Sequence, residues 1–333
     1  MDIYFYGNEH QFSNFHPAPI IYEGKYYRTS EHLFQALKFI NNPEYMEIIR
    51  NSDTPAKCAA LARQKVPKYE NNWYVNRDIY GDLLVENAII LSIQHNIKLR
   101  SDWEEVKDQI MFHCIYLKFT QNLELFEYLK STGNSNIFED SPTDYYWGIG
   151  KTRTGKNRLG ILLMSLRDKL LGRINIFASK FSGNKSSFEY FMNCQELQRA
   201  LFIFNDNATE HKSCKKGRGN ASMRIFNKYS SHIPPRSAGI CTGNYRTGYN
   251  DLNECKNEID SNVNEIKELL STGNYDTIVY SIETYGSAII GTGIFTISDE
   301  IKKYITVEIL KLCLGNRLYF YSEETGISNY VKL

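Results

Sequence analysis

The sequence contains no apolar run close to the ~20 residues that a membrane-spanning helix needs. Its first residues carry neither the basic segment nor the apolar core of a signal peptide. Its 7 cysteines are scattered and form no CxxC pair, which argues against a disulfide framework and a structural zinc site. We therefore expect a soluble, cytoplasmic protein that does not associate with a membrane and binds no metal ion. We also expect it to need no cofactor.

The chain also lacks an excess of charge of either sign. With 39 Lys and Arg against 38 Asp and Glu, its formal net charge is +1, so no global field draws it to nucleic acid. Any anion that it binds must be held by local clusters of cations. Proline is scarce, at 8 residues, and Tyr is abundant, at 24. This bias, with an excess of Asn and Lys, is typical of AT-rich coding, which occurs in some viruses and parasites. If the protein is viral, we expect it to act in the host cytoplasm.

The length of 333 residues indicates two domains. Short strands and turns fill about the first 30 residues, and helical patterns dominate from there to about Arg167. Thr29 or Ser30 can cap the first helix, and Thr54 followed by Pro55 can open the next. We expect helices over residues 30–40, 55–64 and about 80–91, and one or two more over 103–129. Residues 155–171 read as a glycine-led turn into a closing helix.

The pattern changes after Gly172. Two apolar runs, 201–204 and 277–280, predict buried strands, and an amphipathic helix over 259–270 lies between them. The segment 288–295 also reads as a strand. The fold class is therefore α+β, with a mainly helical domain and a small β element over residues 1–172, followed by an α/β domain over 173–333.

One helix face in the first domain combines acidic, amide and basic groups. At about 100° per residue, Glu31, Gln35 and Lys38 fall within a strip roughly 60° wide, and Phe34 and Phe39 flank its edges. A narrow, mixed and aromatic-bounded strip suits the wall of a pocket. The alternative is a surface stripe in which Glu31 and Lys38 form a salt bridge.

A second cluster lies in a predicted loop over residues 139–150, followed by basic residues up to 158. It contains three carboxylates, two glycines and Trp147, whose ring could stack on a flat base. The basic residues and the turn before the last helix could hold a phosphate. The alternative is an acidic turn with a core tryptophan and a solvated basic edge.

Residues 1 to about 170 resemble the NADAR family of YbiA-like N-glycosidases. Matching blocks occur in a fixed order, and the departures are mild: Phe12, for example, stands where the family usually has Leu. The main blocks are Phe12-Ser13-Asn14-Phe15, Thr29-Ser30-Glu31-His32 with Phe34-Gln35-Ala36 and Lys38, Lys118-Phe119, Glu139 with Ser141-Pro142 and Asp144, Trp147-Gly148-Ile149-Gly150, and Gly155 with Asn157.

The resemblance implies a hydrolase that cleaves the N-glycosidic bond of phosphoribosylamino-pyrimidine intermediates of riboflavin biosynthesis. Relatives in the family are also associated with ADP-ribose, so one alternative is removal of ADP-ribose from guanine in nucleic acid. A second alternative is a sensor that binds ADP-ribose or NAD without turnover. The expected partner is thus a small phosphoribosylated or ADP-ribosylated molecule, with nucleic acid only as a modified substrate.

Both substrate types join an exocyclic amine to the anomeric carbon of ribose. Such a bond breaks through an oxocarbenium-like state that needs a carboxylate and a proton donor, or through a ring-opened imine that an amine can attack. We assign the catalytic roles to Glu31, Lys38 and Asp144. The substrate-binding candidates are Asn14, Gln35, Arg77, Trp147, Gly148 and Asn157.

Two loops of the second domain resemble no family but could form a pocket for a nucleotide or phosphate. Residues 204–207 follow a predicted strand, and residues 217–221 precede a segment that carries Arg224. In an open α/β sheet, ligands bind at the carboxyl ends of the strands, where such loops lie. The alternative for the glycine-containing stretch is a flexible, solvated loop.

Overall fold

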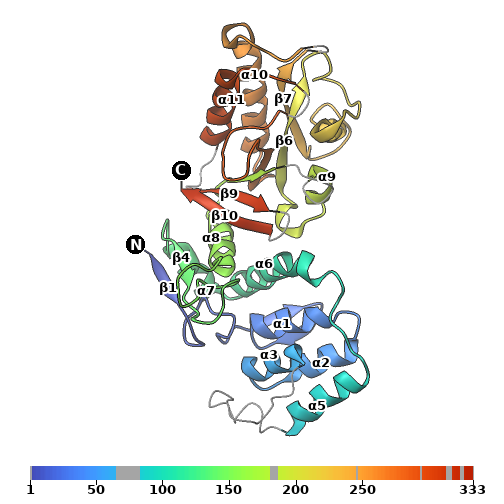
Figure 1. Ribbon diagram of the computed structural model, residues 1–333, viewed down its shortest axis with the longest axis vertical. Helices are drawn as coiled ribbons and strands as arrows, with labels where there is room; N and C mark the ends of the chain where they lie inside the picture. Colours follow the sequence, from blue (N-terminus) through green and yellow to red (C-terminus); the bar gives the residue numbers. More distant parts are fainter. Residues whose placement is uncertain are drawn as a thin grey trace. The chain divides into compact units, whose positions relative to one another are not determined.

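The computed structural model describes residues 2–64, 83–180, 187–244, 247–292, 295–312, 317–322 and 326–332. The chain divides into two compact units, Met1–Leu163 and Met164–Leu333, both drawn in Figure 1. This division falls within helix α8 (Arg158–Leu170), whereas the predicted domain limit at residue 172 lies just after that helix. The limit at 172 stays a prediction.

The first unit contains two small β elements. Strand β1 (Ile3–Phe5) pairs in parallel with β4 (Ile137–Glu139), so that Phe5 lies opposite Glu139. Strands β2 (Ile20–Tyr22) and β3 (Lys25–Tyr27) form an antiparallel hairpin, and both residues of its turn have positive φ. The β1–β4 pair fixes the loop that follows β4 against the start of the chain.

Helices predominate among the other described residues of the first unit, as the sequence predicts. Helix α1 packs against α2, α3 and α6, and Thr29 caps it by accepting a hydrogen bond from the backbone N–H of His32. Thr54 caps α3 in the same way, with Pro55 as the first helical residue. The helices are α1 (Ser30–Ala36), the 3-10 turn η1 (Leu37–Phe39), α2 (Pro43–Asn51), α3 (Pro55–Arg63), α5 (Leu83–Gln94), α6 (Trp103–Gln121), α7 (Leu123–Ser131) and α8.

The second unit is built on a six-stranded sheet in the order β10-β9-β5-β8-β6-β7. All neighbouring pairs are parallel except β9 and β10. The strands are β5 (Asn175–Ser179), β6 (Ala200–Asn207), β7 (Ser237–Gly243), β8 (Thr277–Ser281), β9 (Arg317–Ser322) and β10 (Gly326–Lys332). The helices are α9 (Phe188–Phe191), η3 (Gln195–Leu197), η4 (Gly219–Phe226), α10 (Leu252–Ser271) and α11 (Asp299–Lys311).

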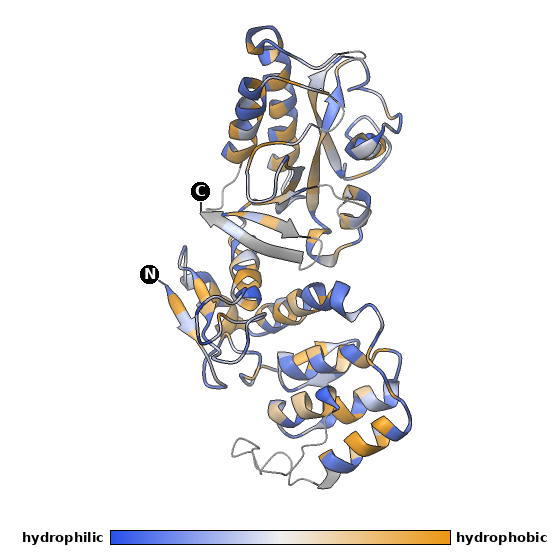
Figure 2. Cartoon of the chain, viewed as in Figure 1, coloured by the Kyte–Doolittle hydropathy of each residue, from blue (hydrophilic) through white to orange (hydrophobic). Residues whose placement is uncertain are grey.

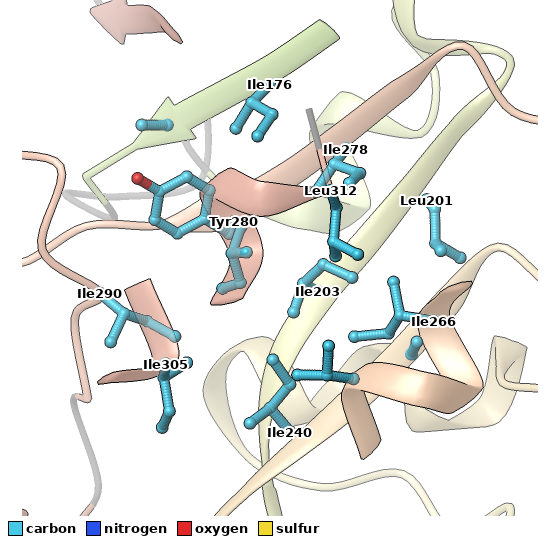
Figure 3. Close-up of a cluster of buried hydrophobic side chains, with 14 of the residues drawn as sticks. Ile176, Leu201, Ile203, Ile240, Ile266, Ile278, Tyr280, Ile290, Ile305 and Leu312 are labelled. Carbon is cyan, nitrogen blue, oxygen red and sulfur yellow. The ribbon is translucent and has the colours of Figure 1, made fainter. Parts of the chain in front are cut away.

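Both faces of this sheet are covered. Helices α10 and α11 lie side by side against one face, where isoleucines such as Ile203, Ile240 and Ile266 gather (Figures 1 and 3). On the other face, Phe188 packs on Phe202, with ring centroids 5.4 Å apart. Helices α10 and α11 each carry hydrophobic and hydrophilic residues, as expected of helices with one buried face (Figure 2). The result is the predicted α/β arrangement.

One predicted strand, 288–295, is wrong. Its described residues form only an isolated antiparallel bridge between Ile290 and Ile282. A Cβ on Gly291 would lie 2.7 Å from the carbonyl oxygen of Ile282, so the segment passes close to the chain just after β8, where the Gly291 N–H donates to the Ser281 carbonyl at 3.0 Å. In the described part of the chain, no helix combines the length and the apolar character that crossing a membrane requires.

Candidate active site

Six of the residues predicted for the site line one cavity of about 390 Å³ in the first unit. Helix α1 and the turn after it supply one wall, and the loop after β4 supplies the opposite one. The six are Asn14, Glu31, Gln35, Lys38, Asp144 and Trp147. The cavity also receives residues that the sequence did not single out for function, among them Arg63 and Glu139.

The predicted strip on α1 is a wall of this cavity. The Gln35 Nε2 donates to the Glu31 Oε1 at 2.6 Å, which fixes the orientation of the carboxyl group. Glu31 is only 7% exposed. Its burial raises the pKa of the carboxyl group, although the hydrogen bond from Gln35 and the charge of Lys38 oppose that change. A buried Glu31 contradicts the alternative of a solvated surface stripe.

Lys38 sits in the 3-10 turn between two aromatic rings. Its Nζ lies 5.1 Å from the ring centroid of Trp103 and 5.5 Å from that of Phe34. Burial lowers the pKa of this amine, and the negative charge of Glu31 only partly offsets the effect. Because Lys38 forms no ion pair with Glu31 or any other described residue, its amine is not tied up in a salt bridge.

Asp144 is held rigidly in the loop after β4. Its Oδ1 accepts hydrogen bonds from the backbone N–H groups of Tyr146, at 2.8 Å, and of Trp147, at 2.7 Å. These bonds close a turn that presents Trp147 to the cavity. The Trp147 ring meets Phe34 edge-on, with centroids 5.5 Å apart, so an aromatic contact from α1 also fixes its orientation.

Glu139, at the end of β4, is a third carboxyl group in the cavity. Burial, together with the charges of Asp144 and Glu31, raises its pKa to about 8. Its Oε2 is buried and has no hydrogen-bond partner among the described residues. Because this pKa lies above neutral pH, the Glu139 carboxyl group is mostly protonated there, and its Oε2 hydrogen-bonds to no side chain or backbone group in the described part of the protein. The sequence marked this residue as part of the family pattern but offered no sign of its environment.

Arg63 is a second cation of the cavity, and the sequence pattern did not point to it. It ends α3 and lines the same cavity, where it forms no ion pair with any described residue. Its charge is close enough to influence the pKa values of both Glu31 and Lys38. An exposed guanidinium at the cavity edge suits an anionic group such as a phosphate.

Two predicted binding residues do not line the cavity, and a third falls outside the part of the chain that the structure describes. Asn157 does not line the cavity: its Oδ1 accepts from the N–H of Glu139 and its Nδ2 donates to the carbonyl of Ile137, so it holds β4. Gly148 is also outside the lining, and a Cβ there would lie 2.7 Å from the carbonyl oxygen of Glu139. Arg77 lies outside the described residues.

Asn14 has a structural task in addition to lining the cavity. Its Oδ1 accepts from the Ser30 hydroxyl at 2.9 Å, and its carbonyl accepts from the Glu31 N–H at 3.1 Å. Both bonds fix the first turn of α1. Within the described ranges, no group of three His, Cys, Asp or Glu side chains is arranged to hold a metal ion.

The comparisons with known proteins concern this same half of the chain. The model of the NADAR domain matches residues 4–171. N-glycosidase YbiA of Escherichia coli (strain K12) is 36% identical over 159 residues, covering 48% of this chain and 80% of the relative. N-glycosidase Npun_R5314 of Nostoc punctiforme is 32% identical over 181 residues, which cover 53% of this chain and 97% of the relative. Riboflavin biosynthesis protein PYRR, chloroplastic, of Zea mays is 31% identical over 173 residues, which cover 49% of this chain and 24% of the relative.

The aligned region contains every residue that lines the cavity. The matched share and the identity exceed what scattered motifs could produce, and they agree with the resemblance read from the sequence. The chain therefore belongs to the NADAR family, with its NADAR domain at residues 4–171.

Proposed function

We propose that the first unit is an N-glycosidase that hydrolyses phosphoribosylamino-pyrimidine intermediates of riboflavin biosynthesis, releasing the amino-pyrimidine and ribose 5-phosphate. The observation that carries the proposal is the gathering of three carboxyl groups and a half-buried amine in one cavity. Relatives that bear the names N-glycosidase and riboflavin biosynthesis protein support the reaction and the substrate class.

The leaving amine needs a proton, and Glu139 is the group best prepared to donate it. With a pKa of about 8, its carboxyl group is protonated at neutral pH, as a general acid must be. The Glu31 and Asp144 carboxyl groups line the same cavity and can stabilise positive charge that develops on the sugar. Two neighbouring carboxyl groups also make it costly for Glu139 to ionise before substrate binds.

Lys38 makes a covalent route possible. After the ribose ring opens, the anomeric carbon is an imine carbon, which an uncharged Lys38 amine can attack. The amino-pyrimidine then leaves with a proton, and a Schiff base joins Lys38 to the sugar. Water hydrolyses this Schiff base, returning the free amine and ribose 5-phosphate. The lowered pKa of Lys38 favours this route because it increases the share of uncharged amine.

The remaining polar and aromatic groups fit the ends of such a substrate. Arg63 can bind the 5-phosphate with paired N–H donors. The half-buried Trp147 offers a ring face to the pyrimidine. A volume of about 390 Å³ lies within the usual range of small-molecule sites.

Substrate class can be tested directly with the full chain. The protein is incubated with a phosphoribosylamino-pyrimidine and, separately, with DNA that carries ADP-ribosyl-guanine, and the released base is measured by chromatography. We expect release from the pyrimidine substrate. Release from the modified DNA alone would instead establish the ADP-ribose alternative, and binding of ADP-ribose with no release from either would establish a sensor.

Trapping with borohydride tests the role of Lys38. We expect the wild-type chain to form a reduced adduct on the peptide that contains Lys38 when it turns over substrate, as shown by mass spectrometry. Lys38→Ala should lose the adduct and lower kcat by at least ~100-fold, as for the loss of a covalent or acid–base group. Lys98→Ala removes an exposed lysine outside the cavity and is the matched control. Full turnover of the wild type without any adduct would favour the oxocarbenium route.

A further inference from the structure

A second and larger cavity, of about 670 Å³, lies in the second unit, which the family comparison does not cover. It brings together the two loops that the sequence marked, the end of β6 and the glycine-containing segment before η4. Residues at the ends of β5 and β8 complete the lining. The cavity therefore lies at the carboxyl edge of the parallel part of the sheet.

The strand order explains why a cavity forms at this place. Strands β8 and β6 are neighbours. From β6 the chain proceeds to β7 at one side of the sheet, whereas from β8 it passes through α11 to β9 at the other side. Because the two connections diverge, a crevice opens above the ends of β6 and β8. Open α/β sheets bind ligands at such switch points.

Two cations in the lining have no counter-charge among the residues that the structure describes. Lys180 follows β5, and Arg218 is the N-cap residue of η4. Both side chains are exposed, and neither forms an ion pair with a residue that the structure describes. The lining carboxylates, by contrast, are already engaged: Glu283 pairs with Lys302 at 2.9 Å, and Glu210 contacts Arg224 at 3.4 Å.

A buried ion pair holds the loop that carries Arg218. The guanidinium of Arg224, only 4% exposed, donates twice to the Asp206 Oδ1, at 2.8 and 2.5 Å. It also donates to the carbonyl of Lys215 at 3.1 Å, which fixes the loop to the end of β6. A Cβ on Gly217 would lie 2.6 Å from the Cβ of Ala221, so the chain returns tightly at this glycine. This anchoring is inconsistent with a flexible, solvated loop.

The rest of the lining suits a planar, partly apolar group. Phe295 and Ile282 supply apolar surface, and the amide side chains of Asn207 and Asn220 supply donors and acceptors. The Asn205 amide is fixed in place because its Nδ2 donates to the Gly291 carbonyl at 2.5 Å. The volume is large enough for a base, a ribose and phosphates together.

From these observations we infer that the second unit binds a nucleotide, with its phosphates at Lys180 and Arg218 and its base against Phe295 and Ile282. The inference does not rest on the proposed N-glycosidase activity, because it involves no residue of the first cavity. It would make the protein a two-site molecule, with a hydrolytic cavity and a separate nucleotide site.

Calorimetric titration of the full chain with ADP, adenosine and inorganic phosphate tests this inference. We expect ADP to bind more tightly than adenosine or phosphate alone, because it reaches both ends of the cavity. The double variant Lys180→Ala/Arg218→Ala should weaken ADP binding by at least about tenfold, as expected for lost charge-assisted hydrogen bonds. The matched control, Lys212→Ala/Lys215→Ala, removes two exposed lysines that do not line the cavity and should leave the affinity unchanged.

A third variant separates a nucleotide site from a simple anion site. Phe295→Ala should weaken ADP binding and leave phosphate binding unchanged, and thermal unfolding checks that each variant is folded. If phosphate binds the wild type as tightly as ADP does, the ligand is a simple anion and the inference is wrong. Equal ADP affinities for the two double variants would also overturn it, since the nucleotide would then bind elsewhere.

Discussion

At the scale of single residues, protonation of Glu139 should control the rate. Its pKa of about 8 means that the proton-donating form predominates below that pH and disappears above it. We expect kcat/KM for the phosphoribosyl substrate to fall as the pH rises through about 8, because the leaving amine then lacks a donor. Glu139→Gln should lower kcat by at least ~100-fold and remove this alkaline limb from the pH profile.

The pH profile also separates a proton donor from a structural residue. Glu139→Asp keeps a carboxyl group and should retain an alkaline limb, even if its rate is lower. Wild-type rates in Glu139→Gln, with an unchanged profile, would assign the proton donation to another group. Glu124→Gln, on an exposed helix start away from the cavity, is the matched control.

Arg63 should act on binding more than on chemistry. Its guanidinium lines the cavity and forms no ion pair with any of the described residues. Arg63→Ala should raise KM for the phosphorylated substrate by about 10-fold or more, with a smaller change in kcat, as for loss of a charge-assisted hydrogen bond. Arg28→Ala, which removes an exposed arginine outside the cavity, should leave both constants unchanged. A loss confined to kcat would contradict phosphate binding by Arg63.

At the scale of secondary-structure elements, a buried ion pair joins α6 to α8. The Arg158 guanidinium, fully buried, donates to the Asp108 carboxylate, which also accepts the Tyr146 hydroxyl at 2.8 Å. This single carboxylate thus links two helices and the turn that carries Asp144. It stabilises the frame on which the loop of the active site is built.

Removing that carboxylate should destabilise the first unit. Asp108→Ala leaves the charge of Arg158 buried without a partner, so we expect a loss of roughly 3–5 kcal/mol in the free energy of unfolding, measured by urea denaturation. Asp102→Ala, at the start of the same helix, removes a half-exposed partner of Arg100 and should cost at most about 1 kcal/mol. Similar losses for the two variants would show that the buried ion pair contributes no more to the free energy of unfolding than the exposed one.

The elements also show which parts of the site the sequence can predict. Glu31, Gln35 and Lys38 lie near one another along the chain, so the helical period alone predicts that they share a face. Arg63 reaches the cavity only because α3 packs on α1, and no local pattern encodes that packing. Asn157 resembles a polar ligand contact in sequence, but the backbone groups of β4 occupy its amide. The segment around Gly291 fails as a strand because β8 leaves it no partner beyond one bridge.

At the scale of the whole molecule, the hydrolytic site should be independent of the second unit. All residues that line its cavity lie between Phe5 and Leu159. A chain that ends at Leu171 keeps α8 whole. A domain of ~170 residues is also long enough to bury the surface that it needs to fold alone. We expect this truncated chain to unfold cooperatively and to keep most of the kcat/KM of the full chain on the small substrate.

The truncation has two informative failures. A folded fragment without activity would show that residues beyond Leu171 contribute to the reaction. An unfolded fragment would show that the C-terminal part of α8 needs its partners in the second unit, where Asp168 accepts the Tyr319 hydroxyl at 3.2 Å. Circular dichroism distinguishes these cases before any activity is measured.

The raised pKa of Glu139 has an evolutionary consequence. Between its usual value of 4.5 and about 8, the carboxyl group stays protonated in the folded chain and ionises in the unfolded chain. Rising pH across this window therefore favours unfolding, so the chain gives up stability to keep an acid in place. A descendant released from selection for hydrolysis would gain stability by replacing Glu139 with a neutral residue. The persistence of this carboxyl group in a lineage would thus be a sign of continued use.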